Sequence, residues 1–136
     1  MITAVDSSVL LDFLNHDPRF GTASRDALRS AAGEGRLLAC DVVWAEVAGW
    51  FPSISACRDT LADLEIEFSA IQSEAAFEAG IAWKAYRQRG GGRTRVAADF
   101  LIGAHALSQA DRLLTRDRGF YRSCFKRLTI VDPTSP

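Results

Sequence analysis

Four acidic residues stand where the chain could bring them together. Asp6 and Asp117 each follow a short apolar run that is typical of a buried strand, and Glu46 and Asp99 each lie in an early turn of an apolar helix. Ligands of open α/β sheets bind at the carboxyl ends of the strands, so we expect all four side chains at that edge. Carboxylates that converge repel one another, and they either take up protons or bind a divalent cation.

The chemistry of an all-oxygen site indicates both the ion and the reaction. Carboxylates are hard ligands, which favour Mg²⁺ or Mn²⁺ over zinc. An ion held in this way positions a phosphodiester, activates a water molecule and stabilises the leaving oxygen. We therefore expect a metal-dependent hydrolase of phosphodiesters. A second interpretation stays open for Asp99, because a single acid near a helix start also stabilises the first turn.

The elements that must position these acids alternate between strand and helix. Short apolar runs predict strands at residues 2–5, 37–40, 66–68, 112–115 and 128–131. Amphipathic or apolar periodicity predicts helices at residues 9–14, 22–32, 42–50, 52–64, 73–89 and 97–107. Glu46 shares a helical face with Val42, Val43 and Trp50, so its carboxylate is expected to point toward apolar surroundings.

Length and composition indicate one soluble domain spanning residues 1–136. Hydrophobic residues make up 48% of the 136, which is enough for one ordinary core. The net charge of -1 argues against a protein that coats nucleic acid by bulk electrostatics. The three cysteines lack the spacing of a disulfide framework or a zinc site, and no apolar run approaches the ~20 residues of a membrane span. We expect a cytoplasmic protein with no membrane contact.

Arginines gather around Gly90–Gly92 and beside Asp117. Arginine recognises phosphate through a planar fork of donors, so local RNA binding is one interpretation of this pattern. An exposed, solvated connection is the other. The residues concerned are Arg87, Arg89, Arg93, Arg95 and Arg116. By contrast, Asp111 and Asp132 lie away from the expected site, and we expect both to be solvated charges.

Four short motifs, in order along almost the whole chain, resemble those of PIN-domain ribonucleases, in particular VapC-type toxins. They are DSSVLL at residues 6–11, EV at 46–47, ADFLIGA at 98–104 and LLTRDRGF at 113–120. The resemblance implies a three-layer α/β/α fold around a central five-stranded parallel sheet. It also implies an endoribonuclease that depends on Mg²⁺ or Mn²⁺, cuts single-stranded or loop RNA such as transfer RNA, and is masked by an antitoxin.

The same resemblance assigns roles to individual residues. The acidic quartet has the catalytic role, and it comprises Asp6, Glu46, Asp99 and Asp117. Three of its members are the expected metal ligands, namely Asp6, Asp99 and Asp117. Ser7 takes the hydroxyl position that steadies such a site, and Thr115 is expected to help similarly. His105 adds an imidazole to a helix of mostly small residues, and we expect it to be a packing residue.

Other classes of protein fit the pattern less well. A haloacid-dehalogenase-like phosphatase needs a second acid two residues after the first, where this chain has Ser8. A response-regulator receiver domain needs an acid pair after its first strand and a lysine near the end of its last strand, and neither is in place. A catalytically silent PIN-like module that only binds proteins is the remaining alternative, although buried charges are costly to keep unused.

The aromatic residues predict the oligomeric state. Several of them lie outside the most apolar runs, and together they exceed what one small core readily hides. They are Trp44, Trp50, Phe51, Trp83 and Tyr86. We therefore expect a homodimer, with burial of these residues in the core as the alternative.

Overall fold

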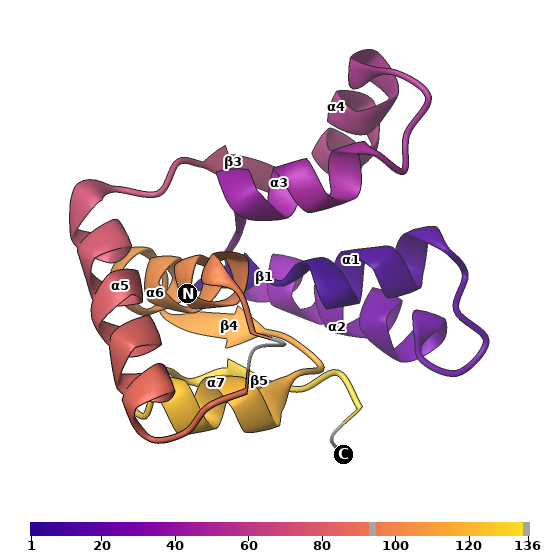
Figure 1. Ribbon diagram of the computed structural model, residues 1–136. Coiled ribbons are helices and arrows are strands. Elements are labelled where there is room, and N and C mark those ends of the chain that lie inside the picture. Colours follow the sequence, from indigo (N-terminus) through magenta and orange to yellow (C-terminus); the bar gives the residue numbers. More distant parts are fainter. Residues whose placement is uncertain (93–94, 135–136) are drawn as a thin grey trace.

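The centre of the fold is a parallel sheet (Figure 1). In the computed structural model, which describes residues 1–92 and 95–134, five strands form this sheet in the order β3-β2-β1-β4-β5. Their bounds are Ile2–Val5 (β1), Arg36–Cys40 (β2), Ile66–Ser69 (β3), Arg112–Leu114 (β4) and Ile130–Val131 (β5). Each of the five lies within or next to a run predicted as a strand from the sequence.

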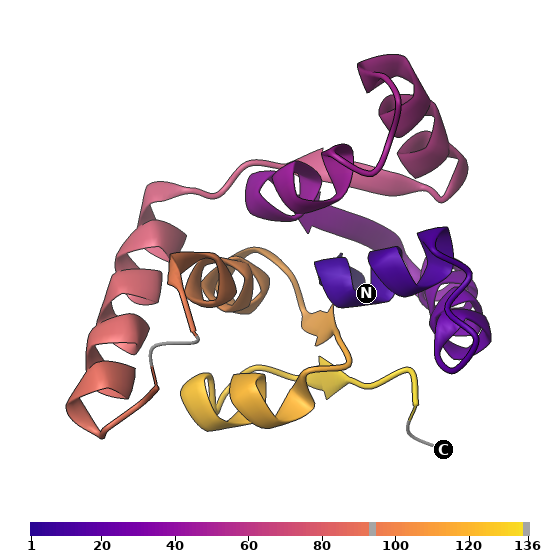
Figure 2. The ribbon, with the colours of Figure 1, turned by 45° about the vertical axis from the view of Figure 1, so that its right-hand side comes forward.

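The helices cover the two faces of this sheet, which confirms the predicted three-layer α/β/α architecture. α1 and α2 lie on one face, whereas α6 lies against β1 and β4 on the other and carries α5 on its outer side (Figure 2). α3 and α4 extend over β2 and β3 (Figure 1). The helices of the described residues span Ser7–Leu14 (α1), Gly21–Glu34 (α2), Asp41–Ala48 (α3), Ile54–Asp63 (α4), Ser73–Gln88 (α5), Ala97–Gln109 (α6) and Arg118–Cys124 (α7).

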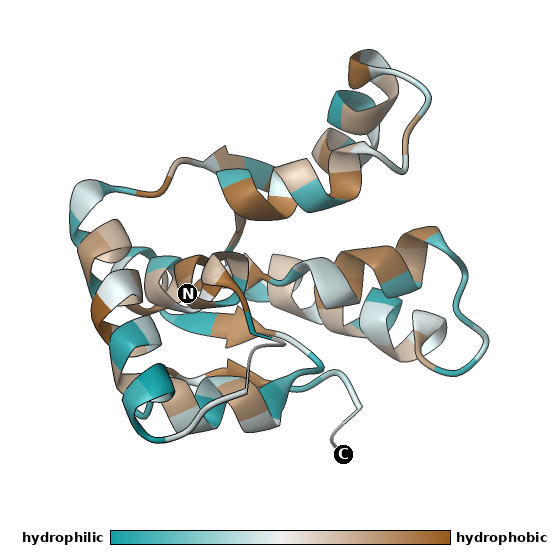
Figure 3. Cartoon of the chain, in the orientation of Figure 1, coloured by the Kyte–Doolittle hydropathy of each residue, from teal (hydrophilic) through white to brown (hydrophobic). Residues whose placement is uncertain are grey.

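Apolar burial explains why the strands and α6 lie at the centre. Both faces of the sheet are covered, so β1 and β4 carry almost only buried residues, and Val5, Leu113 and Leu114 are among the most buried. Phe100 on α6 packs onto the same core. His105 is also buried, and its Nε2 lies 2.9 Å from the hydroxyl of Ser69, as expected for a packing residue. Hydrophilic residues gather instead in the α1–α2 loop and at the end of α5 (Figure 3).

The strand order reverses between β1 and β4, and this reversal creates the place for a site. The connections from β1 run outward through β2 to β3, whereas the chain then crosses back to β4 and continues to β5. Loops that leave β1 and β4 therefore turn to opposite faces, and a crevice opens between them at the carboxyl ends of the strands. None of the described helices has the length and apolar character needed to cross a lipid bilayer.

The two acids expected to be solvated differ from each other in the structure. Asp111 is exposed, as expected, although its Oδ2 accepts a hydrogen bond of 2.6 Å from the backbone N–H of Ile2. The expectation for Asp132 is wrong, because only 5% of its side chain is exposed and its Oδ2 lies 3.4 Å from Nε of Arg118. Thr134 also donates to Asp132 through its backbone N–H and its hydroxyl.

Close packing of α6 gives a test of the fold at Gly103. A Cβ atom at this position would lie 2.4 Å from Cε2 of Phe125, whose ring is buried and has little room to move. We expect Gly103→Ala to lower the free energy of unfolding by about 1–3 kcal/mol, as overpacking does. Gly80→Ala on α5 is the matched control, since no atom of the described residues lies within 4 Å of its added Cβ. At Gly80 the better helix propensity of alanine should raise the free energy of unfolding by up to about 1 kcal/mol, and urea unfolding measures both variants.

Candidate active site

Asp6 is the most buried acid of the candidate site. It follows β1, and its backbone N–H donates to the carbonyl of Leu114 at the end of β4 across 3.0 Å. Its side chain is 5% exposed and accepts hydrogen bonds from the hydroxyls of Thr115 (2.7 Å) and Ser8 (3.1 Å) to Oδ2. Thr115 in turn accepts the backbone N–H of Asp117 at 2.9 Å. Thr115 therefore connects two of the predicted site residues.

Ser7 connects Asp6 to Glu46 on α3. The Ser7 hydroxyl lies 3.1 Å from Oε1 of Glu46 and 3.4 Å from Oδ1 of Asp6. Because this hydroxyl carries one hydrogen, it donates to one carboxylate at a time. The prediction that Glu46 points toward apolar surroundings is wrong, since Glu46 is exposed at the rim of the site. The reason is that Val42 is only half-buried and Trp50 is exposed, so this face of α3 lies at the edge of the core.

Asp99 lies in the first turn of α6. Its Oδ2 accepts the backbone N–H of Val96 at 3.2 Å, so Asp99 does stabilise the helix start. Its other oxygen, Oδ1, lies 4.0 Å from Nη1 of Arg95. The two interpretations of Asp99 are thus compatible, because one oxygen caps the helix while the other faces the site.

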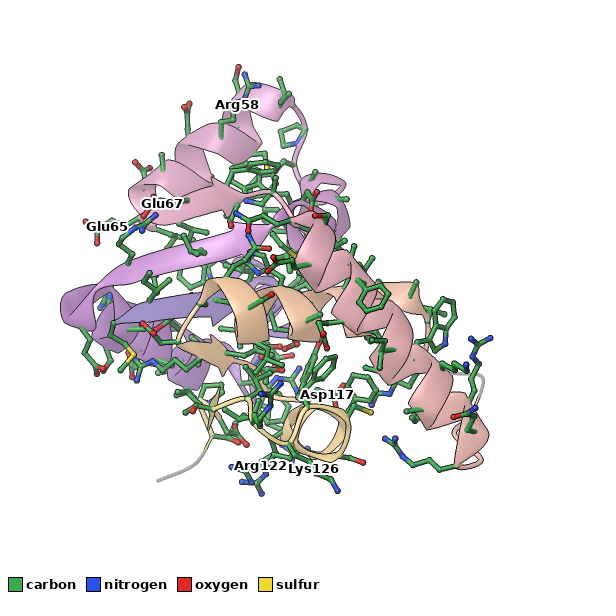
Figure 4. All side chains as sticks on the ribbon, turned by 90° about the vertical axis from the view of Figure 1, so that its left-hand side faces the viewer. Arg58, Glu65, Glu67, Asp117, Arg122 and Lys126 are labelled. Carbon is green, nitrogen blue, oxygen red and sulfur yellow. The ribbon has the colours of Figure 1, made fainter. Side chains whose placement is uncertain are left out.

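Arg95 and Asp117 form a two-bond ion pair. Nη1 of Arg95 lies 2.5 Å from Oδ2 of Asp117, and Nη2 lies 3.2 Å from Oδ1. The guanidinium also lies 4.3 Å from the ring centre of Phe120. Figure 4 places Asp117 at the start of α7 toward α6, whereas Arg122 and Lys126 point outward from that region. Arg95 therefore lies inside the site that it was expected only to border.

The surroundings of two acids of the site raise their pKa values. Burial raises the pKa of Asp6, and its hydrogen bonds oppose this only in part. Glu46 is exposed as a residue, but the protein atoms around its carboxyl group remove part of its hydration and so raise its pKa, and the charges of Asp6 and Asp99 raise it further. The hydrogen bonds to Asp117 raise the pKa of Arg95.

Tyr121 on α7 is a neighbour of the site that sequence analysis missed. Its side chain is buried, and burial together with the charges of all four acids raises the pKa of its phenol. Tyr121 therefore lies within electrostatic reach of all four acids. Sequence periodicity did not reveal Tyr121, because α7 has only seven residues and is too short to show a helical period.

The four carboxylates do not form a ready cage for a metal ion. Within residues 1–92 and 95–134, no three acidic, histidine or cysteine side chains group closely enough to hold one. The acids instead form two pairs, Asp6 with Glu46 and Asp99 with Asp117, so the three expected ligands do not meet around one ion. Mg²⁺ commonly keeps several waters and takes only one or two carboxylates directly. Glu46 lies near enough to Asp6 and Asp99 for both charges to raise its pKa, so these three acids are the ones that would hold a hydrated ion, directly or through its waters.

The remaining arginines expected to bind RNA have different surroundings. Arg87 and Arg89 lie at the exposed end of α5, with their guanidinium carbons 4.9 Å from the ring centre of Trp83 and 5.5 Å from that of Tyr86. Arg93 lies outside the described residues. The end of α5 therefore offers two exposed cations, held by aromatic rings, for contact with phosphate.

Arg116 is held from behind the site. Its Nε and Nη2 donate to the buried carboxylate of Asp12 at 2.5 and 2.9 Å, and Ser24 donates to the same carboxylate. Its guanidinium carbon lies 4.1 Å from the ring centre of Phe20. The structure thus gives Arg116 an anchoring role in the β4–α7 turn, next to Thr115, and its contact with RNA stays a prediction.

The raised pKa of Asp6 predicts how stability varies with pH. Between the ordinary value of 3.8 and the raised value, the folded chain binds more protons than the unfolded chain, so stability falls as pH rises. In metal-free buffer, Asp6→Asn should flatten this fall and should melt at a higher temperature than wild type at about pH 7. Thermal melts from about pH 4 to pH 7 measure it, with Asp59→Asn on the exposed side of α4 as the control. A variant with the wild-type slope would contradict the assignment.

Comparisons with known proteins identify the family. The VapBC2 complex of Rickettsia felis, bound to a promoter DNA fragment, includes a chain with TM-score 0.75 and 18% identity, covering 97% of this chain and 98% of that one. A chain of VapBC-1 from nontypeable Haemophilus influenzae has a TM-score of 0.76 and 18% identity, and the match covers 99% of this chain and 100% of that one. A chain of FitAcB from Neisseria gonorrhoeae has a TM-score of 0.69 and 18% identity, and the match covers 98% of both chains. At this identity they show a shared fold, and a comparison with curated proteins gave no match. The PIN domain family profile matches residues 3–126, and the chain therefore belongs to the PIN domain family.

Proposed function

We propose that this PIN domain is a metal-dependent endoribonuclease and the toxin of a toxin–antitoxin pair, acting in the cytoplasm. One observation carries the proposal. Four carboxylates from four separate elements lie at the carboxyl ends of β1 and β4, where the Ser7 hydroxyl lies between Asp6 and Glu46, the Thr115 hydroxyl joins Asp6 to the backbone of Asp117, and Arg95 lies between Asp117 and Asp99. The family and the fold of the toxin–antitoxin neighbours support the same function.

In the proposed site, Asp6, Glu46 and Asp99 are the residues that would hold Mg²⁺ or Mn²⁺. The bound ion supplies a positive charge for the phosphodiester and lowers the pKa of a water molecule. Thr115 fixes the orientation of the Asp6 carboxylate through its 2.7 Å hydrogen bond. Glu46 is exposed and has a raised pKa, so its carboxylate is suited to accept the proton of the attacking water.

The substrate that fits this site is single-stranded or loop RNA, for which transfer RNA is one candidate. An open site at a sheet edge reaches a backbone that is splayed out more easily than one inside an A-form duplex. The rival is a silent module that only binds proteins. Burial of Asp6 disfavours this rival. A buried carboxyl group with a raised pKa lowers the stability of the fold when it is ionised, and a module that only binds proteins has no use for it.

Acid substitutions and metal removal test the proposed activity. Asp6→Asn and Asp99→Asn should each lower the cleavage of a labelled RNA by about 100-fold or more at saturating Mn²⁺, and excess EDTA should abolish wild-type cleavage. Asp111→Asn is the matched control and should cleave at the wild-type rate. Asp132 is unsuitable as a control because it is buried in an ion pair. Equal cleavage by Asp99→Asn and wild type would overturn the proposed role of the acids, and an absence of cleavage by wild type at saturating Mn²⁺ would leave the silent module.

A cognate antitoxin is the protein partner in this proposal. Chains of the same fold have been solved as VapBC and FitAcB complexes. An apolar groove of about 760 Å³ lies between α3, α4 and β3, and its lining includes Trp44, Phe51 and Phe68. The indole N–H of Trp44 is buried without a hydrogen-bond partner among the described residues. A polypeptide covering this groove would bury apolar surface and could offer that N–H a carbonyl oxygen.

A homodimer is also part of the proposal, although the surface differs from the expected one. Trp83 and Tyr86 pack against Phe100 in the core, with ring centres 6.0 and 5.5 Å from it. Of the five aromatic residues that motivated the dimer, Trp50 alone is exposed. The more exposed apolar residues of α5 are Phe77 and Ile81, one helical turn apart and exposed by 69% and 48%. A second copy of this chain is the occupant that we propose for this stripe.

Light scattering tests the dimer. At tens of micromolar, roughly the range of an ordinary interface, wild-type protein should have the mass of two chains. Ile81→Glu should convert it to one chain without lowering the melting temperature, because Ile81 lies outside the core. Ile54→Glu introduces the same change at an exposed isoleucine of α4 and should leave the mass unchanged. A monomeric wild type would remove the dimer from the proposal.

A further inference from the structure

Asp117 stands apart from the other acids in the way its oxygens are used. Oδ2 and Oδ1 both accept hydrogen bonds from Arg95, at 2.5 and 3.2 Å. Asp6 and Glu46, by contrast, accept only from hydroxyls among the side-chain donors described. Metal binding at Asp117 would have to compete with a two-bond, charge-assisted ion pair, which is among the strongest pairings of side chains.

Arg95 has both a fixed position and free donors. The fork to Asp117 and the ring of Phe120 at 4.3 Å hold its guanidinium beside Asp99. A guanidinium has five N–H groups, and the fork uses one on each terminal nitrogen. The side chain is 30% exposed, so the other N–H groups can reach a ligand from solvent.

The sign of the charge favours an anion as that ligand. Four carboxylates repel a phosphodiester, and one divalent ion supplies only two positive charges against them. The guanidinium of Arg95 supplies a third charge next to Asp99, one of the residues that would hold the ion. Planar forks of N–H donors match phosphate oxygens as well as carboxylate oxygens.

We infer that Arg95 is a positioning residue that binds the phosphate of the RNA substrate, and that Asp117 serves to hold Arg95 and does not ligate the metal. This inference rests on the proposed nuclease function. It divides the acidic quartet by role, with Asp6, Glu46 and Asp99 on the metal side and Asp117 on the substrate side. Arg116, in the β4–α7 turn, pairs with the buried Asp12, which is not an acid of the quartet, and is therefore not assigned this role.

Two measurements on the same variants separate the roles. Mn²⁺ affinity is measured by isothermal titration of the RNA-free protein, and KM and kcat are measured with a labelled RNA at saturating Mn²⁺. Arg95→Gln and Asp117→Asn should each raise KM roughly tenfold to hundredfold, as the loss of a charged hydrogen bond does, and should change Mn²⁺ affinity less than about threefold. The double variant should be no worse than the worse single variant, because both act through one contact.

Conservative and control variants sharpen the test. Arg95→Lys keeps the charge without the fork, so its KM should fall between wild type and Arg95→Gln. Asp99→Asn should lower Mn²⁺ affinity by about tenfold or more, as expected for a ligand. Arg122→Gln removes an arginine of α7 that points outward (Figure 4) and should change neither quantity. Circular dichroism melts confirm that each variant is folded.

Three results would overturn the inference. The first is a loss of Mn²⁺ affinity in Asp117→Asn as large as that in Asp99→Asn. The second is an unchanged KM in Arg95→Gln. The third is tighter Mn²⁺ binding in Arg95→Gln by tenfold or more, which would make Arg95 a counter-ion that the metal displaces. These failures differ from failure of the proposed function, in which the wild-type protein itself would not cleave RNA at saturating Mn²⁺.

Discussion

The burial of the Asp6 carboxylate is the constraint on which the rest of the site depends. A carboxylate at the end of a buried strand loses most of its hydration, and the chain offsets this cost with three hydroxyl donors from two different loops. One donor, Thr115, comes from the strand that pairs with β1 only because the chain crosses the sheet a second time. The polar contact that stabilises Asp6 thus also ties the two sides of the crevice together.

The two carboxylate pairs of the site use different kinds of bridge. A neutral hydroxyl, that of Ser7, lies between Asp6 and Glu46, and it leaves their negative charges uncompensated. A cation, Arg95, lies between Asp99 and Asp117 and compensates one of them. Loss of hydration is the main cause that raises the pKa values of Asp6 and Glu46, and neighbouring acids add to it, whereas the hydrogen bonds to Asp117 raise the pKa of Arg95. A divalent ion is most strongly attracted to the uncompensated pair, and an anion to the side of the cation.

The sequence was sufficient to predict the parts of the fold that depend on local pattern. Apolar runs predicted the strands and the longer helices, and the acids that follow two of these runs, Asp6 and Asp117, were expected at one edge of the sheet. Contacts between residues far apart in the chain could not be predicted from this pattern. The pairing of Arg116 with Asp12, for example, joins side chains 104 positions apart, and an arginine beside an acidic motif looks equally suited to RNA. The partner of such an arginine can be identified only when the order of the strands in the sheet is known.

Helix orientation and short elements account for the other differences. Glu46 has apolar residues at helical spacing, yet α3 lies at the rim of the core, so the same periodicity that predicts burial places this side chain in solvent. Asp132 follows the last strand, where a solvated tail is the ordinary expectation, but its carboxylate is buried and pairs with Arg118 at the start of α7. Tyr121 belongs to a helix too short to show a period. In each case the sequence fixes the residue type and its spacing, while the position of the whole element decides its exposure.

In the proposed function, the raised pKa values of Asp6 and Glu46 would couple metal binding to proton release, because a carboxyl group must lose its proton before it can hold Mg²⁺ or Mn²⁺. The charged form of Glu46 is also the form that would accept a proton from water. The burial that destabilises a charged Asp6 in the free chain thus also prepares the site for its proposed chemistry.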